Sequence, residues 1–281
     1  MQTTETVGGI TYSKPVVTLL HAAPLVNAEV AGRTCYSSFD NSEHEQVRGF
    51  DCSQVEDIEH SDLLDSLCHV YFHESVVEHI NLTYHISGTS RGVLQEQVRH
   101  RIAAYSVKST RYTMQDVLHA FNACALSTRE NAKHDFTQLI EPMDMFVVQD
   151  MAATVEIHSL YEKLHYQLRT LGAEEFGNLS MSKSAKDVFA YREVFESPED
   201  LFNALCDCKS KRNVGDFVKG WVVTDSWKVD MVVTFNLRSL KNYFDLRDSG
   251  AAFFGIKHLA QAMKDVTPDK YLDLIIKPKK S

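Results

Sequence analysis

The sequence has little of what marks disordered, fibrous or repetitive chains. It contains 12 glycines and 6 prolines among 281 residues, and 44% of its residues are hydrophobic while 24% are charged. Collagen-like, low-complexity and disordered chains depart strongly from such values. A chain of this length buries roughly three quarters of its unfolded surface, so a hydrophobic core alone is enough to stabilise it. We therefore expect a folded globular protein.

Positive charge and long apolar runs are also scarce. The chain carries 29 Lys and Arg against 38 Asp and Glu, a formal net charge of -9. Non-specific binding to nucleic acid needs Lys and Arg spread over a broad surface, so we expect no nucleic-acid partner. No run approaches the roughly 18 apolar residues of a membrane span, and residues 1–20 lack the pattern of a signal peptide. We expect a cytoplasmic protein with no membrane partner.

Cysteine and histidine are not grouped as metal ligands would be. The six cysteines are Cys35, Cys52, Cys68, Cys124, Cys206 and Cys208. Only the last two lie close together, and C-x-C without a second pair falls short of a four-ligand zinc site. In HESVVEH (73–79) the two His are six residues apart, whereas zinc proteases use H-E-x-x-H on one helix face. We expect reduced cysteines and no metal.

Two segments have the pattern of half-buried strands. In residues 80–87 and 229–236, apolar residues recur at every second position, which is the period of side chains along a strand. The Gly-Thr-Ser stretch at 88–90 predicts a turn, and its hydroxyls are good N-caps for a helix that continues to about Arg101.

Helical spacing dominates the rest of the chain. Residues 136–171 carry apolar side chains at the spacing of one or two long amphipathic helices, with Gly172 as the stop. Residues 239–247 also have a helical pattern, and a last helix is predicted over 252–266, before Pro268. We find no repeat or linker, so we predict a single domain. Many helices with few strands indicate an α+β fold, with a mixed or antiparallel sheet flanked by long helices.

Two polar segments are candidates for ligand binding. Between Arg99 and Arg111 there are four Lys or Arg residues and no carboxylate, so donors for an anion are concentrated there. The alternative is a solvated basic loop, since exposed charge runs are common. Farther on, Arg238 and Asn242 are four residues apart and share a helix face, where they can converge on one planar ligand. The alternative is an exposed polar helix face.

Four blocks, taken in order, resemble the flavin-dependent thymidylate synthases. They are AGRTCYSS (31–38), HESVVEHINLTYHI (73–86), an RHR-x7-S pattern (99–109) and NLRSLKNYFDLR (236–247). The resemblance spans about residues 15 to 270. It leaves some forty residues, 174–213, without a match, and a surface insertion of this kind costs little stability.

The resemblance implies a homotetramer that binds FAD and converts dUMP to dTMP. NADPH would be the reductant and methylenetetrahydrofolate the one-carbon donor. In this family reduced flavin carries the one-carbon unit and supplies the hydride, so no cysteine nucleophile is needed. The sequence agrees, because none of the six cysteines lies in an electropositive motif that would lower its pKa.

The resemblance also implies roles for individual residues. Those expected at the flavin are Cys35, Ser75, Arg99, His100, Arg101, Asn236, Arg238, Asn242 and Leu246. Those expected at dUMP are Glu96, Arg99, Lys108, Ser109, Thr110, Arg111, Lys219 and Arg247, with Lys219 aligned across a one-residue gap. The residues expected in catalysis are Arg247, Ser109 and His73. Arg247 would stabilise enolate charge on the uracil, and His73 would organise water or folate.

Several polar positions depart from the family pattern. The usual Asn and Glu after RHR are Ser106 and Val107 here, and Phe253 and Gly255 replace a Gln and a Glu. The usual Gln before RHR is Glu96, which we expect to return the missing carboxylate from the neighbouring helix. Because unpaired buried groups discriminate strongly between substrates, these changes keep two other readings open. In the first, the chain has the same fold and flavin chemistry but acts on UMP or dCMP, or makes a hydroxymethyl product. In the second, it is a non-catalytic relic that binds a nucleotide or flavin.

Overall fold

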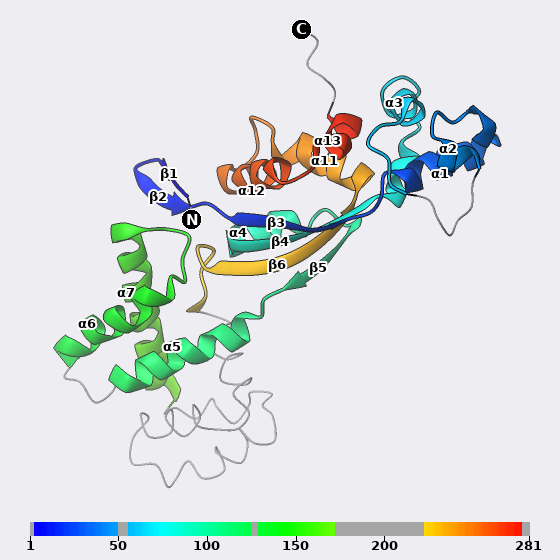
Figure 1. Cartoon of the computed structure of the whole chain (residues 1–281). Coiled ribbons are helices and arrows are strands. Elements are labelled where there is room, and N and C mark those ends of the chain that lie inside the picture. The colour runs from blue at the N-terminus through cyan, green and yellow to red at the C-terminus, as the bar shows by residue number, and fades with distance from the viewer. Residues whose placement is uncertain (1–2, 50–55, 125–128, 172–221, 277–281) are drawn as a thin grey trace, which may run out of the picture. The chain divides into compact units, whose positions relative to one another are not determined.

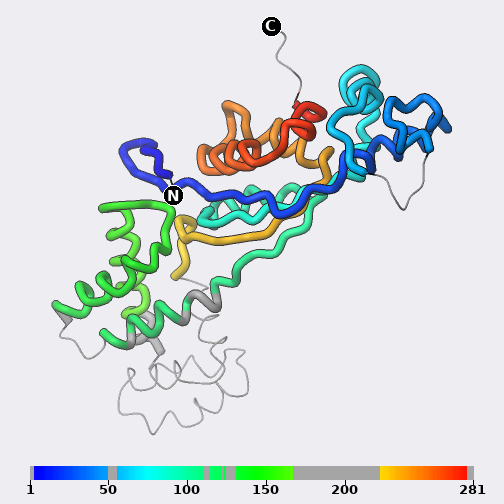
Figure 2. Tube along the Cα trace, viewed as in Figure 1, coloured from blue at the N-terminus to red at the C-terminus, as the bar shows by residue number. Residues whose placement is uncertain are grey.

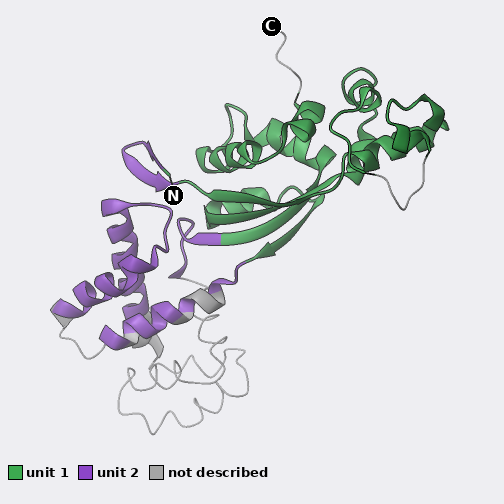
Figure 3. Cartoon of the chain, in the orientation of Figure 1, with its two compact units in different colours: residues 1–3, 14–107, 230–281 green, residues 4–13, 108–229 purple. Residues whose placement is uncertain are grey.

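The computed structural model describes residues 3–49, 56–124, 129–171 and 222–276. The chain divides into two compact units, one of residues 1–3, 14–107 and 230–281 and the other of residues 4–13 and 108–229 (Figure 3). A single domain for the whole chain stays a prediction. The unmatched segment 174–213, Gly172 and Lys219 lie outside the described residues.

The first unit is built on a four-stranded sheet with the order β3-β4-β6-β5. Its strands are β3 (Val16–Ala22), β4 (Asn81–Ser90), β5 (Ala103–Val107) and β6 (Lys228–Asn236). β3 pairs antiparallel with β4, and β5 pairs antiparallel with β6. Segments far apart in the sequence thus lie side by side, as the trace in Figure 2 shows. The two predicted strands are confirmed, with bounds shifted by a few residues.

Alternation along the central strands sends one face of the sheet into the core. Leu82, Tyr84 and Ile86 of β4 are buried, and so are Met231, Val233 and Phe235 of β6. The residues between them are polar or half-buried, and on that other face the hydroxyls of Thr83 and Thr234 lie 2.9 Å apart. Period-2 patterning therefore decides which face the helices cover.

Helices complete the first unit, and α11, α12 and α13 lie together on one face of the sheet (Figure 1). The unit contains α1 (Val26–Tyr36), η1 (Phe39–Asn41), α2 (Glu45–Arg48), α3 (Asp62–His69), η2 (Glu74–His79), α4 (Arg91–Gln97), α11 (Leu237–Arg247), α12 (Phe254–Asp265) and α13 (Asp269–Ile275). Their apolar faces and the sheet form one continuous core. The α+β class is confirmed.

The second unit joins a hairpin to three helices. The hairpin consists of β1 (Thr4–Val7) and β2 (Ile10–Ser13), and its two turn residues, Gly8 and Gly9, have φ of 60° and 82°. A two-residue hairpin turn with positive φ at both positions favours glycine, which has no Cβ. The helices are α5 (Thr110–Cys124), α6 (Arg129–Ile140) and α7 (Asp150–Leu171), with η3 (Glu141–Met143) between the last two.

The turn and helix end predicted around the RHR motif are wrong in detail. Residues 88–90 continue β4, where the carboxylate of Asp230 accepts hydrogen bonds from Gly88 N and Ser87 Oγ, both at 2.9 Å. Ser90 is nevertheless the N-cap of α4, since its Oγ accepts from Val93 N. The helix ends at Gln97 rather than near Arg101.

Of the one or two long helices predicted over 136–171 the structure has two, whereas the helix predicted to be the last is followed by another. The long helical stretch is two helices, because residues 144–148 leave helical geometry to pair with 226–228 through the bridge between Phe146 and Trp227. The helix predicted over 252–266 is α12, but the chain does not end its helical structure there. Pro268 precedes another helix, α13, whose buried Tyr271 and Leu274 pack into the core. None of the helices in the described ranges is long and apolar enough to cross a membrane.

Candidate active site

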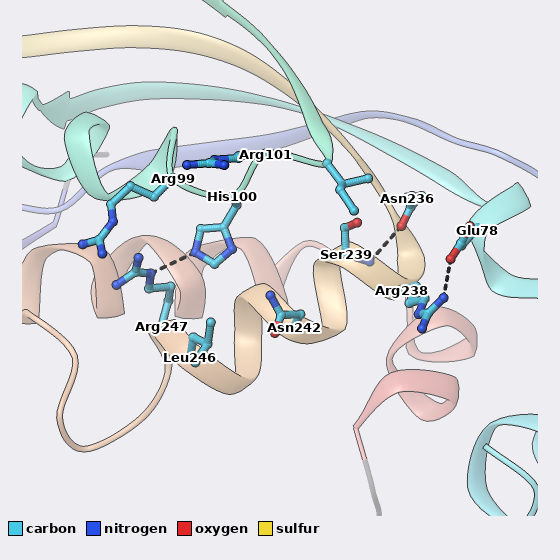
Figure 4. Close-up of a pocket in the computed structure, with 11 residues that line it drawn as sticks. Glu78, Arg99, His100, Arg101, Asn236, Arg238, Ser239, Asn242, Leu246 and Arg247 are labelled. Carbon is cyan, nitrogen blue, oxygen red and sulfur yellow. Dashed lines mark hydrogen bonds and ion pairs between the residues drawn. The ribbon is translucent and has the colours of Figure 1, made fainter. Parts of the chain in front are cut away.

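A pocket of about 640 Å³ opens in the first unit. It is formed by the loop after α4, the end of β6 and the first helix after it, with one side chain from η2 (Figure 4). Its lining residues are Glu78, Arg99, His100, Arg101, Ile102, Asn236, Arg238, Ser239, Asn242, Leu246 and Arg247. This volume lies in the range of small-molecule sites. The RHR and NLRSLKNYFDLR blocks, which are 135 residues apart, therefore meet in one cavity.

Helix α11 presents a polar face to this pocket. Asn236 is its N-cap, with Oδ1 accepting from Ser239 N at 2.8 Å. Arg238, Asn242 and Leu246 follow at four-residue spacing and are exposed on one face, while Leu240 and Tyr243 are buried on the other. The prediction that Arg238 and Asn242 share a helix face is confirmed.

The RHR residues lie in a loop, and His100 anchors that loop to the core. Its ring is 9% exposed and packs edge-on against Tyr243, with ring centroids 4.9 Å apart. The hydroxyl of Tyr105 donates to the carbonyl oxygens of His100 and Gln97 at 3.0 and 2.9 Å. Because His100 is fixed in this way, its neighbours Arg99 and Arg101 are left exposed at the pocket.

All three guanidinium nitrogen atoms of Arg247 contact other protein groups. Its Nε donates to His100 Nε2 at 2.9 Å, its Nη1 lies 2.8 Å from Glu96 Oε2, and its Nη2 donates to the carbonyl oxygen of Glu96 at 3.3 Å. Burial, followed by the charges of Arg247 and Arg99, lowers the pKa of His100 below its usual value. The neutral ring can accept a hydrogen bond at Nε2, so the two side chains are matched in protonation state.

Two other arginines of the pocket differ in their partners. Arg238 Nη1 donates to Glu78 Oε1 at 2.6 Å. Arg101 has no hydrogen bond or ion pair with any residue in the described part of the chain. Arg101 is thus a cation available to an anionic ligand. Glu78 was missed by the sequence analysis, although it lies inside the HESVVEH block, and so were Ser239 and Ile102.

Four residues predicted at the flavin or in catalysis lie outside the pocket lining, namely Ser109, which belongs to the second unit, and three residues of the first unit. Cys35, His73 and Ser75 are exposed, on α1 and around η2, two elements that contact each other. His73 Nδ1 lies 2.9 Å from the hydroxyl of Tyr36. Tyr36, Tyr71 and His73 thus form a separate exposed group, in which the ring centroid of Tyr71 lies 6.3 Å from that of His73.

The residues predicted to hold dUMP divide between the two units. Lys108, Ser109 and Thr110 belong to the second unit, where Lys108 is exposed and Thr110 is buried at the start of α5. Arg111 follows on the same helix, but its side chain is outside the description. Glu96 and Arg247 belong to the first unit.

Apart from Glu96, the positions that depart from the family pattern lie on β5 and around the start of α12. On β5, Ser106 and Val107 are exposed and pair with Val232 and Met231 of β6. Phe253 is 48% exposed. A Cβ added to Gly255 would lie 2.9 Å from both the Phe253 ring and Val93 Cγ2. Glycine at 255 thus permits close packing of α12 on α4, and a Glu there would collide with both neighbours.

The two buried cysteines in the described residues, Cys68 and Cys124, are held mainly in the thiol form. Burial raises the pKa of the Cys68 thiol to about 11 and also raises the pKa of Cys124. Since the thiolate is the nucleophilic form, neither residue is primed for attack on a substrate.

Comparison with known proteins identifies the family of the chain. The family model described as thymidylate synthase complementing protein matches residues 18–270. The flavin-dependent thymidylate synthase of Campylobacter jejuni is 28% identical over 91% of this chain and 93% of its own length. That of Helicobacter pylori strain 26695 is 27% identical over 89% and 92%.

A solved structure shows the same fold. The crystal structure of thymidylate synthase X from Helicobacter pylori with FAD and dUMP has a TM-score of 0.57 and 26% identity, covering 93% of this chain and 97% of that one. The resemblance read from the four blocks is confirmed, and with it the prediction of an enzyme. The chain belongs to the thymidylate synthase complementing protein family, the family of the flavin-dependent thymidylate synthases.

Proposed function

We propose that this enzyme methylates dUMP to dTMP, with FAD as cofactor, NADPH as reductant and methylenetetrahydrofolate as one-carbon donor. The observation that carries the proposal is Arg247, a guanidinium fixed on three atoms beside a neutral histidine at the wall of a pocket. A fixed cation can stabilise charge that develops on a substrate, because it needs no reorganisation during the reaction.

FAD fits the side chains that line this pocket. Its diphosphate is anionic and suits the unpaired guanidinium of Arg101, and its ring carries carbonyl oxygens and ring nitrogens that suit Asn242 and Arg238. We assign Arg99, His100, Arg101, Asn236, Arg238, Asn242 and Leu246 to this role, together with Cys35 and Ser75, which are exposed outside the pocket lining. When bound, FAD carries the one-carbon unit and supplies the hydride.

The protein's own residues would act on the nucleotide. A guanidinium has five N–H donors, and three nitrogen atoms of Arg247 already bond to protein, so at least one N–H on each Nη remains for a carbonyl of uracil. As C5 of the ring becomes nucleophilic, negative charge moves to that carbonyl oxygen, where Arg247 stabilises it. Lys108, Ser109, Thr110, Arg111 and Lys219 are proposed as further dUMP-binding residues.

His73 is proposed to organise water or folate. Its Nδ1 is engaged by the Tyr36 hydroxyl, which leaves Nε2 of the exposed ring for a ligand. We also propose that the enzyme is a homotetramer. Exposed aromatic side chains beside His73 support this, since Tyr36, Tyr71 and Phe72 are each more than half exposed and such groups mark interfaces. Cytoplasmic location is supported by the free thiols of Cys35, Cys68 and Cys124.

A mass-spectrometric product assay tests the function. The purified protein receives FAD, NADPH, methylenetetrahydrofolate and an equal mixture of dUMP, UMP and dCMP, and we expect a methyl group on dUMP alone. Methylation of another acceptor, or a hydroxymethyl mass, would contradict the dUMP assignment and implicate the changed residues. No product at all would favour the binding relic, which the retained set of positioned arginines argues against.

A further inference from the structure

Two arginines share one carboxylate at the α4 end of the pocket. Arg247 Nη1 lies 2.8 Å from Glu96 Oε2, and Arg99 Nη1 lies 3.1 and 3.2 Å from the two oxygens of the same side chain. Both arginines line the pocket. A carboxylate between two guanidinium groups occupies the place that a phosphate takes in arginine-rich anion sites.

The two ion pairs differ in how easily a ligand can open them. The side chain of Arg247 is 17% exposed and has two further partners, His100 and the carbonyl of Glu96. That of Arg99 is 69% exposed, and Glu96 is its ion-pair partner. The carboxylate therefore lowers the positive charge around the well-anchored Arg247 and is also the ion-pair partner of the exposed Arg99.

A carboxylate is needed for this double contact. Each of its oxygens accepts hydrogen bonds and carries negative charge, whereas an amide has one accepting oxygen and an NH2 group that guanidinium groups repel. The resemblance places Gln at this position in the usual family pattern, and a Gln there would lack the negative charge of this bridge.

We propose that Glu96 is an internal counterion that keeps phosphate groups away from Arg99 and Arg247. It thereby determines which end of a nucleotide meets Arg247. A phosphate would have to displace Glu96, while a neutral pyrimidine ring needs only the remaining N–H donors. Glu96 thus reserves Arg247 for charge that appears during the reaction. The identity of the ring rests on the proposed function, but the exclusion of phosphate does not.

The test measures binding of inorganic phosphate to the full chain by titration calorimetry, without substrates. We expect Glu96→Gln to bind phosphate about tenfold more tightly than the wild type, because it removes the charge between two cations. Glu96→Asp keeps the charge and is expected to match the wild type. The matched control is Glu59→Gln, which removes an equal charge from the exposed pair with Lys270, away from this pocket.

A double variant assigns the new phosphate site. In Glu96→Gln with Arg99→Ala, the gain should disappear, since one of the two cations is missing. Phosphate affinity of a folded Glu96→Gln within twofold of the wild type would overturn the inference, as would a gain that persists without Arg99.

Kinetics add a readout that a purely structural role would not change. In Glu96→Gln, phosphate should inhibit competitively with dUMP at about tenfold lower concentration than in the wild type, as the affinity gain requires. If the wild type makes dTMP but Glu96→Gln shows no gain in phosphate binding, the counterion role of Glu96 is refuted and the proposed function stays intact. A gain in phosphate binding by Glu96→Gln, together with a wild type that makes no dTMP, would refute the function and leave the counterion intact.

Discussion

Replacing Arg247 by Ala tests the chemical role of the pocket. The substitution removes the donors at His100 and at Glu96, but Glu96 keeps its ion pair with Arg99 and stays about one-third exposed. The unpaired group is therefore Nε2 of His100, a nearly buried neutral ring nitrogen. Loss of one such hydrogen bond costs about 1–3 kcal/mol, so Arg247→Ala should fold.

The expected loss of activity is larger than the loss of stability. Removing one preorganised donor from a site where charge develops lowers kcat by about 10²- to 10³-fold. Bound flavin, measured by its absorbance after gel filtration, should stay near the wild-type level, since Arg99, Arg101 and Arg238 remain. Arg247→Lys should recover little, because one ammonium cannot reach all three acceptors.

The assay compares kcat at saturating dUMP with the unfolding midpoint of the same preparation. A kcat within tenfold of the wild type in a folded, flavin-loaded Arg247→Ala would refute the role of this arginine. An equal fall of kcat and flavin content would show that Arg247 serves binding and not the reaction.

Three other perturbations follow from the same geometry. Asn236→Ala should lower the unfolding free energy by about 1 kcal/mol in urea melts through loss of the α11 cap, while Asn236→Asp should keep it. The pKa of His100 is lowered in the folded state. The stability that the neutral ring contributes is therefore complete above the unfolded pKa of about 6.5 and is lost as pH falls through the folded pKa. In His100→Asn, the curve of unfolding free energy against pH should be flatter in that range. Gly255→Ala should cost about 1–3 kcal/mol by overpacking, and Val93→Ala in the same chain should return part of it; unchanged stability of the single variant would contradict the close contact.

Local pattern was enough to predict the central strands and the caps. Alternation in residues 80–87 and 229–236 specified both the strands and their buried faces, because side chains of a strand point alternately to its two sides. Ser90 caps α4 as predicted, since capping needs only the backbone within three residues. The four blocks also identified the family, because motif order and spacing are properties of the chain alone.

Contacts between distant segments decided the rest. The helix break at 144–148 depends on pairing with 226–228, and α4 stops at Gln97 where Tyr105 and Tyr243 hold the following loop. The partners come from other elements, so local sequence does not predict these pairings; Pro142 is a local signal only for a helix end just before residue 144.

The ion pair between Glu96 and Arg247 also depends on both the local sequence and the tertiary structure. Sequence comparison marked both residues as candidates for the nucleotide, but it placed no bond between them. They are 151 residues apart and meet only because the fold brings the end of α4 against the end of α11. Residue chemistry along the chain determined which side chains were available. Tertiary packing added Arg247 to the local pair of Glu96 with Arg99, because electrostatic pairing depends on distance in space.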